Sequence, residues 1–207
     1  LKPGEVLPKE VKNLKYLETF ALASNDNNQI RDMELGEDIC ELAHLKNLAI
    51  QAYGLVKLPA NFKKLGKTLE NLNLVSNNFN RLSDITKVVN ARNFPHLHTL
   101  TLYAQRRTDV CINMSGLSKN GDDNYVYNNY PIGMYGNISS DYTERQAFLS
   151  LLTWDNLRAL ELSYCFLEGE LPSDEDMDKA LEAAGKPTRY TAADFSTNKA
   201  DWQDKLV

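Results

Sequence analysis

The stretch LENLNLVSNNF, residues 69–79, carries the pattern from which the fold can be predicted. Leu72 and Leu74 alternate with polar or small residues, so both leucines lie on one face of a short strand. Leu69 comes three residues earlier, from the preceding loop, into the same core. Asn77 follows the strand, and its side chain can bond backbone groups that a tight turn would otherwise bury unpaired. The stretch therefore predicts a strand that leads into a tight turn around an inward-facing asparagine.

The pattern recurs along the chain as LxxLxxLxLxx[N/C]xL, with aromatic residues at some leucine positions, in sets that begin at Leu14, Leu42, Phe94 and Trp154. The third apolar residues of the five sets are Phe20, Leu48, Leu72, Leu100 and Leu160, so the steps between them are 28, 24, 28 and 60 residues. The first three steps fit the period of about 20–29 residues that is typical of leucine-rich repeats. The last step is about two repeats, so 103–153 holds a degenerate repeat, an insertion or both.

The chain resembles leucine-rich repeat proteins over about 1–105 and 150–172. FLEGELP (166–172) resembles the LxGxIP continuation of the plant-specific repeat class, and KLPANFKKL (57–65) and VLPKEVKNL (6–14) resemble its LPxxxxxL convex segment. Together with a Tyr/Asn-rich insertion, the pattern resembles secreted or lipid-anchored surface proteins of Bacteroidetes bacteria. The resemblance implies an exported protein whose repeats bind proteins or glycans.

The repeats predict an α/β fold, a curved leucine-rich repeat solenoid with a parallel sheet on the concave side and short helices or 3₁₀ turns on the convex side. The predicted domains are a repeat domain over 1–172, with the insertion at about 105–142, and a helical C-terminal segment of the last repeat, or a cap, over 173–207. The convex segments expected to be helical are Leu35 to Leu48, Ser83 to Ala91 with Ser83 as N-cap, Tyr142 to Leu152, and 173–185 with Ser173 as N-cap and Gly185 at the end.

The residue that turns inward after each strand varies between repeats. Asn25 and Asn77 can bond the turn fully, and Cys165 can bond it weakly. Tyr53 and Gln105 depart from the pattern, so the turns around them are expected to be irregular.

Composition excludes several classes of protein. The 207 residues carry 23 Lys+Arg and 28 Asp+Glu, a net charge of −5, which argues against nucleic acid as the main partner. The longest apolar runs have four residues, whereas a membrane-spanning helix needs roughly 20, so no membrane insertion is expected. The cysteines, which form no disulfide framework and are expected to be free thiols, are Cys40, Cys111 and Cys165. The N-terminus carries no signal peptide and no start methionine, which indicates a mature or truncated piece of a longer protein.

No catalytic, metal or cofactor motif occurs in the sequence. His96 and His98 flank Leu97 and are expected on the surface without a third ligand. Neither enzymatic activity nor a cofactor is therefore expected.

Two surfaces are candidates for binding. The concave face carries the outward residues of the strands, which are small, polar and nearly uncharged, and its candidate partner-binding residues are Gln51, Asn71, Asn73, Thr101 and Tyr103. The insertion combines tyrosines with Asn, Gly, Ser and Asp, as an antibody paratope does, and its candidates are Tyr125, Tyr127, Tyr130 and Tyr135. The alternatives are an idle sheet face and a tyrosine-rich hairpin that packs over the sheet for stability.

The leading hypothesis is a non-enzymatic protein- or glycan-binding module of an exported bacterial protein, at the cell surface or outside the cell. One alternative is a structural spacer or stalk domain without a ligand of its own. The other is an intracellular protein-interaction repeat protein, for which three reduced cysteines would suit.

Overall fold

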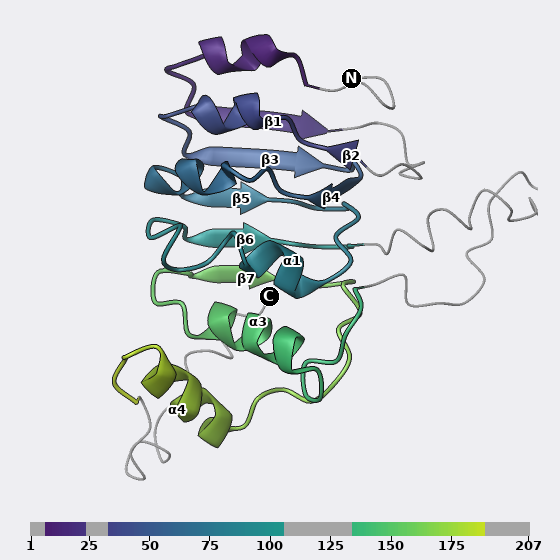
Figure 1. Cartoon of the computed structure of the whole chain (residues 1–207), viewed down its shortest axis with the longest axis vertical. Helices are drawn as coiled ribbons and strands as arrows, with labels where there is room; N and C mark the ends of the chain where they lie inside the picture. Colours follow the sequence, from purple (N-terminus) through teal and green to yellow (C-terminus); the bar gives the residue numbers. More distant parts are fainter. Residues whose placement is uncertain (1–6, 24–32, 106–133, 189–207) are drawn as a thin grey trace, which may run out of the picture.

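The computed structural model describes residues 7–23, 33–105 and 134–188. Its main element is a parallel sheet whose strands follow one another along the solenoid in the order β1-β3-β5-β6-β7. The strands are β1 (Thr19–Ala23), β3 (Asn47–Gln51), β5 (Asn71–Asn73), β6 (Thr99–Thr101) and β7 (Ala159–Glu161). All of them run in the same direction (Figure 1).

The register of the sheet is the predicted register of the repeats. One row of paired residues crosses all five strands and consists of Phe20, Leu48, Leu72, Leu100 and Leu160. Strand β6 pairs directly with β7, so no further strand of this sheet lies between the two. The described part of this step, 103–105 and 134–153, adds no strand between β6 and β7, and the choice between an insertion and a degenerate repeat stays a prediction.

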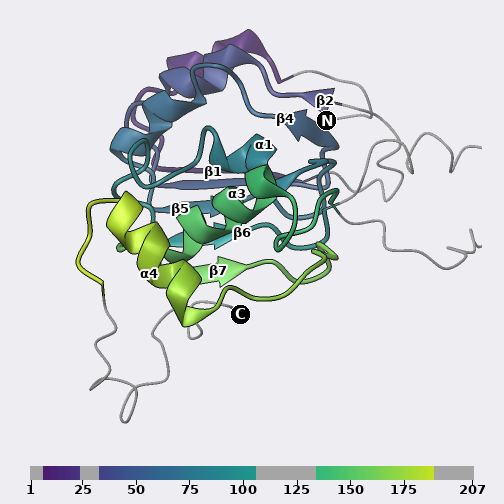
Figure 2. The same ribbon diagram turned by 60° about the horizontal axis from the view of Figure 1, so that its bottom comes forward.

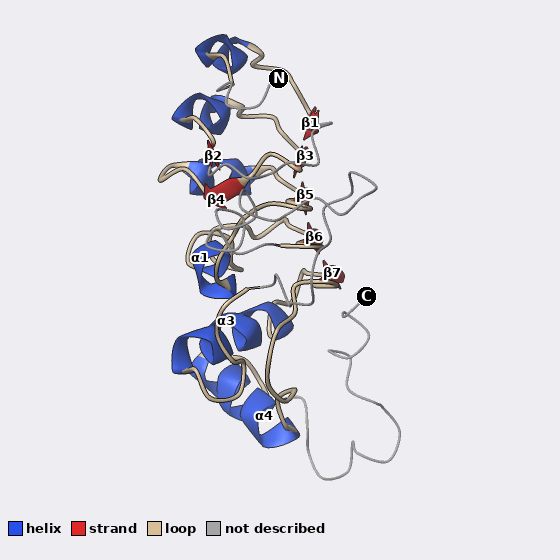
Figure 3. Ribbon diagram, turned by 90° about the vertical axis from the view of Figure 1, so that its right-hand side faces the viewer, coloured by secondary structure: helices blue, strands red, loops and turns tan. Residues whose placement is uncertain are grey.

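The convex side is built from short helical segments, separated from the strands by the core (Figure 3). Among the described residues, the 3₁₀ helices are η1 (Lys9–Asn13), η2 (Glu37–Glu41) and η3 (Phe62–Lys67). They are followed by the α-helices α1 (Leu82–Thr86), α3 (Tyr142–Leu152) and α4 (Asp174–Ala183), of which α4 lies beside α3 (Figure 2). The predicted bounds of α3 are confirmed, as are the Ser173 cap and the end of α4 at Gly185.

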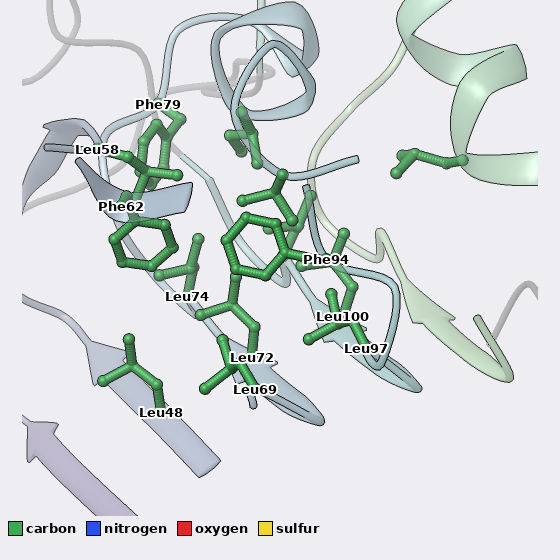
Figure 4. Close-up of a cluster of buried hydrophobic side chains, with 14 of the residues drawn as sticks. Leu48, Leu58, Phe62, Leu69, Leu72, Leu74, Phe79, Phe94, Leu97 and Leu100 are labelled. Carbon is green, nitrogen blue, oxygen red and sulfur yellow. The ribbon is translucent and has the colours of Figure 1, made fainter. Parts of the chain in front are cut away.

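The core lies between these two layers and consists of stacked leucines and phenylalanines (Figure 4). Leu72 and Leu100 are at most 1% exposed, and Phe62 and Phe94 pack with ring centroids 5.9 Å apart. Each repeat buries its apolar residues against its neighbours, which makes stability a property of the stack.

A second parallel sheet, which the sequence did not predict, follows the turns. It pairs β2 (Met33–Glu34) with β4 (Leu55–Lys57). Backbone hydrogen bonds extend this layer across the later repeats, from Asn78 N to Leu55 O at 2.8 Å and from Tyr135 N to Asn80 O at 2.6 Å.

The turns after the strands are alike, so the expectation of irregular turns at Tyr53 and Gln105 is wrong. The residue before the inward position has a φ of 54° to 57° in all four described turns, at Ala52, Ser76, Ala104 and Tyr164. Gln105 Nε2 donates to Leu74 O at 2.7 Å and to Leu102 O at 3.1 Å, because the longer amide still reaches the carbonyls of the turn.

The turn around Tyr53 is held by the asparagine of the next repeat. Asn77 Oδ1 accepts from Tyr53 N at 3.2 Å and from Leu55 N at 3.1 Å, while Asn77 Nδ2 donates to Ile50 O at 2.8 Å. The predicted role of Asn77 is confirmed. The weak bond expected of Cys165 is also present, since its Sγ donates to Leu102 O at 2.9 Å.

Of the predicted insertion, the structure describes Gln105 and 134–142. These later residues belong to the stack, since Met134 N donates to Cys165 O at 2.9 Å and Ile138 N donates to Glu168 O at 2.7 Å. Asn25, Cys111, Tyr125, Tyr127 and Tyr130 lie outside the described residues. The division into 1–172 and 173–207 stays a prediction.

The expected N-cap role of Ser83 is wrong, because Ser83 lies inside α1 and the helix begins one residue earlier. The first N–H groups of α1 are capped from another helix by Glu144 of α3, whose Oε2 accepts from Leu82 N at 2.9 Å. A carboxylate is well placed there, because it satisfies donors that the first turn of a helix leaves without a partner.

Candidate binding face

The concave face is formed by side chains that alternate with the buried leucines. These outward residues are Thr19, Ala21, Ala23, Asn47, Ala49, Gln51, Asn71, Asn73, Val75, Thr99, Thr101, Tyr103, Ala159, Glu161 and Ser163. Pairing of the strands arranges them in three rows across the solenoid. The predicted candidates Gln51, Asn71, Asn73, Thr101 and Tyr103 are all half-buried and share this face, but whether they bind a partner stays a prediction.

The first row, at the N-terminal ends of the strands, bonds to itself. Asn71 Nδ2 donates to Asn47 Oδ1 at 2.7 Å, and Asn47 Nδ2 donates to Thr19 Oγ1 at 3.1 Å. These hydrogen bonds between side chains occupy polar groups that could otherwise bind a ligand.

The second row contains Asn73, Thr101 and Glu161 on three adjacent strands. Asn73 Oδ1 accepts from Val75 N at 3.0 Å, which fixes the amide and leaves its nitrogen without a partner among the described residues. Glu161 is the charged residue of the concave face. The row therefore offers an amide donor, a hydroxyl and a carboxylate side by side.

The third row continues beyond the strand ends and contains Gln51, Val75, Tyr103 and Ser163. Backbone bonds hold it in register, from Ser76 N to Tyr103 O at 2.8 Å and from Ala104 N to Ser163 O at 2.9 Å.

Three aromatic rings meet at the end of this row that lies in the last two described repeats. They belong to Tyr103, Tyr164 and Phe166, which we call the aromatic platform. The ring centroids of Tyr103 and Tyr164 are 5.2 Å apart at an interplanar angle of 62°, and those of Tyr164 and Phe166 are 6.2 Å apart at 78°. Tyr164 is 62% exposed and Phe166 is 48% exposed. The platform thus presents ring surface to solvent beside the polar second row.

Tyr103 is a candidate predicted from the sequence, whereas Tyr164 and Phe166 are not. One signal could have found Tyr164: the position before the inward residue is small in the other described turns, at Ala52, Ser76 and Ala104, and aromatic in this one.

Tyr135, the fourth insertion candidate, lies elsewhere. It is half-buried, and its backbone N–H donates to Asn80 O in the second parallel layer. The structure thus places Tyr135 in the repeat that follows the insertion.

The thiols beneath and beside the sheet are buried and free. Burial raises the pKa of the Cys165 thiol to about 11 and that of the Cys40 thiol to about 12, and nearby acidic groups add to the second shift. Both cysteines are therefore protonated at neutral pH, a state in which a thiol is a poor nucleophile.

Other features of the described residues lie away from the concave face. A hollow of about 820 Å³ is lined by the second sheet and by convex segments. Another, of about 430 Å³, is lined by the ends of η1 and η2 and the loops that follow them. No group of three His, Cys, Asp or Glu side chains in the described ranges is arranged to hold a metal ion. No helix within those ranges has the length and apolar character to span a bilayer.

The inward leucine rows, the parallel register and the amide-bonded turns define a leucine-rich repeat fold. The structure is similar to that of a leucine-rich repeat protein of Leptospira interrogans, with 20% sequence identity and a TM-score of 0.41 over 86% of this chain. The match covers 45% of that protein, so this chain spans less than half of its length. No protein-family model matches the sequence, and no curated protein matches it.

Proposed function

We propose that the chain is a non-enzymatic recognition module that binds a protein or a glycan on the concave face. The observation that carries the proposal is the continuity of this face, which crosses five strands and ends in exposed aromatic rings. Exposed aromatic residues next to hydrogen-bonding groups are typical of binding surfaces, because rings contribute large contact areas at low entropic cost.

The charge of the face favours an uncharged ligand. Glu161 is its charged residue, and no lysine or arginine stands among the outward residues. Proteins bind nucleic acids through clustered basic side chains, so this surface is poorly suited to a nucleic acid. Recognition would rest on ring contacts and hydrogen bonds, with little electrostatic steering.

A non-enzymatic role is supported by the state of the polar groups. The described cysteines are buried with raised pKa values. His44 lies in the loop between η2 and β3, where its ring stacks on Tyr16 with centroids 5.8 Å apart. The concave face itself offers no paired acid and base.

We further propose that the module belongs to an exported protein of a bacterial cell surface, as the resemblance of its repeats to such proteins implies. The alternatives make different predictions. A spacer domain would bind nothing through the concave face, and an intracellular interaction protein would bind a protein of the cell interior.

The proposal is tested with the purified chain against a displayed peptide library and an array of glycans. Asn73 and Thr101 are paired neighbours in the centre of the face, so Asn73→Lys with Thr101→Lys should cover it with long charged side chains. Gln146→Lys, at an exposed position of α3, is the matched control. We expect ligands of the native chain to be retained by the control and lost by the double variant. Equal binding by both variants would place the site outside the concave face, and the absence of any ligand in both screens would favour a spacer.

A further inference from the structure

We propose that the aromatic platform is a stacking subsite for the ring of an uncharged sugar, so that the ligand of the concave face is a neutral glycan. This inference rests on the proposed function and narrows it to one class of ligand. It is carried by the exposure, backbone conformation and polar surroundings of Tyr103, Tyr164 and Phe166.

The backbone presents the two outer rings at positions that seldom carry them. Tyr164 has a φ of 57° and Phe166 a φ of 50°, in the left-handed region that non-glycine residues rarely adopt. The position of Phe166 is taken in the second repeat by Gly54, with a φ of 83°. Both residues are bulky and lie at strained positions, and they are 62% and 48% exposed, so core packing does not explain their place.

The segment that carries the rings is fixed from two sides. Cys165, between the two aromatic residues, is fully buried, and its Sγ donates to Leu102 O at 2.9 Å. Its carbonyl oxygen accepts from Met134 N at 2.9 Å. The backbone that carries the rings is therefore held in place before any ligand arrives, which lowers the entropic cost of binding.

The surroundings of the platform fit the two kinds of surface on a sugar ring. A pyranose has an apolar C–H face, which stacks on aromatic rings, and an edge of hydroxyl groups, which needs donors and acceptors. The second row supplies the Asn73 amide nitrogen, the Thr101 hydroxyl and the Glu161 carboxylate. The carboxylate can accept from sugar hydroxyls but would repel an acidic sugar, so the combination favours a neutral glycan.

The main rival occupant is a lysine or arginine side chain of a protein, because aromatic faces beside a carboxylate also attract cations. The two occupants differ in their need for the charge of Glu161. Glu161→Gln keeps an acceptor for sugar hydroxyls and removes the attraction for a cation.

The experiment is calorimetric titration of the native chain with neutral hexasaccharides of glucose, xylose, mannose and N-acetylglucosamine, together with an arginine- and lysine-rich peptide. We expect at least one hexasaccharide to bind, and Tyr164→Ala and Tyr103→Ala each to weaken it by about tenfold or more. Tyr164→Phe and Glu161→Gln should keep most of the affinity. Tyr142→Ala is the control, because Tyr142 is 78% exposed on α3, away from the platform. Circular dichroism confirms that each variant is folded.

Three results would overturn the inference. They are no binding to any hexasaccharide, a sugar affinity in Tyr103→Ala and Tyr164→Ala equal to that of the native chain, and binding of the cationic peptide alone that is lost in Glu161→Gln. The last two results would leave the proposed function standing, provided that Asn73→Lys with Thr101→Lys abolishes the binding observed. Absence of every ligand, including those of the peptide library, would remove both.

Discussion

Glu144 on α3 accepts a hydrogen bond at 2.9 Å from the backbone N–H of Leu82, the first residue of α1. Its other carboxylate oxygen accepts from the Ser83 hydroxyl at 2.5 Å. Arg81 adds an ion pair with Asp141, the N-cap residue of α3, at 2.9 Å. The repeat that follows the insertion is thus joined to the preceding one by a buried polar contact as well as by its leucines.

Replacing Glu144 should destabilise the protein. Glu144→Ala leaves the Leu82 N–H buried without an acceptor, and we expect a loss of about 1–3 kcal/mol in the free energy of unfolding. Glu144→Gln, which keeps one acceptor oxygen, should lose less. Thr143→Ala, at the exposed neighbouring position, is the control. Urea denaturation gives the values, and an unchanged midpoint for Glu144→Ala would show that water replaces the contact.

Leu72 tests the register of the repeats. It is 1% exposed and pairs with Leu48 and Leu100 in the central row of the sheet. Leu72→Ala should cost about 2–5 kcal/mol, because a cavity opens between neighbouring repeats. Val75→Ala, on the concave face, should cost less. A loss below about 0.5 kcal/mol for Leu72→Ala would contradict the assigned burial.

Gly66, in η3, lies at a close backbone approach between two repeats. A Cβ atom at Gly66 would collide with the carbonyl oxygen of Asn93 in the next repeat. Gly66→Ala should therefore destabilise by about 1–3 kcal/mol through forced separation of the backbones. Gly36 has no atom within 4 Å of the added Cβ, so Gly36→Ala is the matched control and should lower the melting temperature little. Equal melting temperatures for the two variants would argue against the close approach.

Asp176 should make stability depend on acidic pH. Hydrogen bonds from Ser173 and then from Arg145, whose Nη2 lies 2.6 Å from Oδ2, lower the pKa of Asp176 to about 2. Because the folded pKa lies below the unfolded value of about 3.9, the contribution is present above pH ~4 and is lost as pH falls towards 2. In Asp176→Asn, the melting temperature should depend less on pH between pH 4 and 2 than it does in the native chain. Parallel curves for the variant and the native chain would contradict this assignment.

The repeat register was predictable because leucines that alternate with polar residues can bury themselves in one way only. Helices α3 and α4 were predictable from their apolar spacing and, for α4, from Ser173 and Gly185. The cap of α1 was not predictable, because its acceptor lies 62 residues away in the sequence. The second sheet was missed because its strands of two and three residues carry no periodic pattern.

The candidate site was predictable in part. The residues of the concave face were predicted correctly, because successive side chains of a strand point to opposite faces and the inward leucines were known. The aromatic platform depends on left-handed backbone at Tyr164 and Phe166, which propensities assign to glycine or asparagine. Only the three-dimensional turn shows that these residues project beside Tyr103.

NMR can show whether ligands bind on the concave face. Backbone amide shifts of the isotopically labelled chain are recorded with and without the strongest ligand from the screens. The account predicts that the largest shift changes fall at Asn73, Thr101, Tyr103 and Tyr164, with the amides of η2, η3 and α4 unchanged. Changes confined to the convex segments would contradict it.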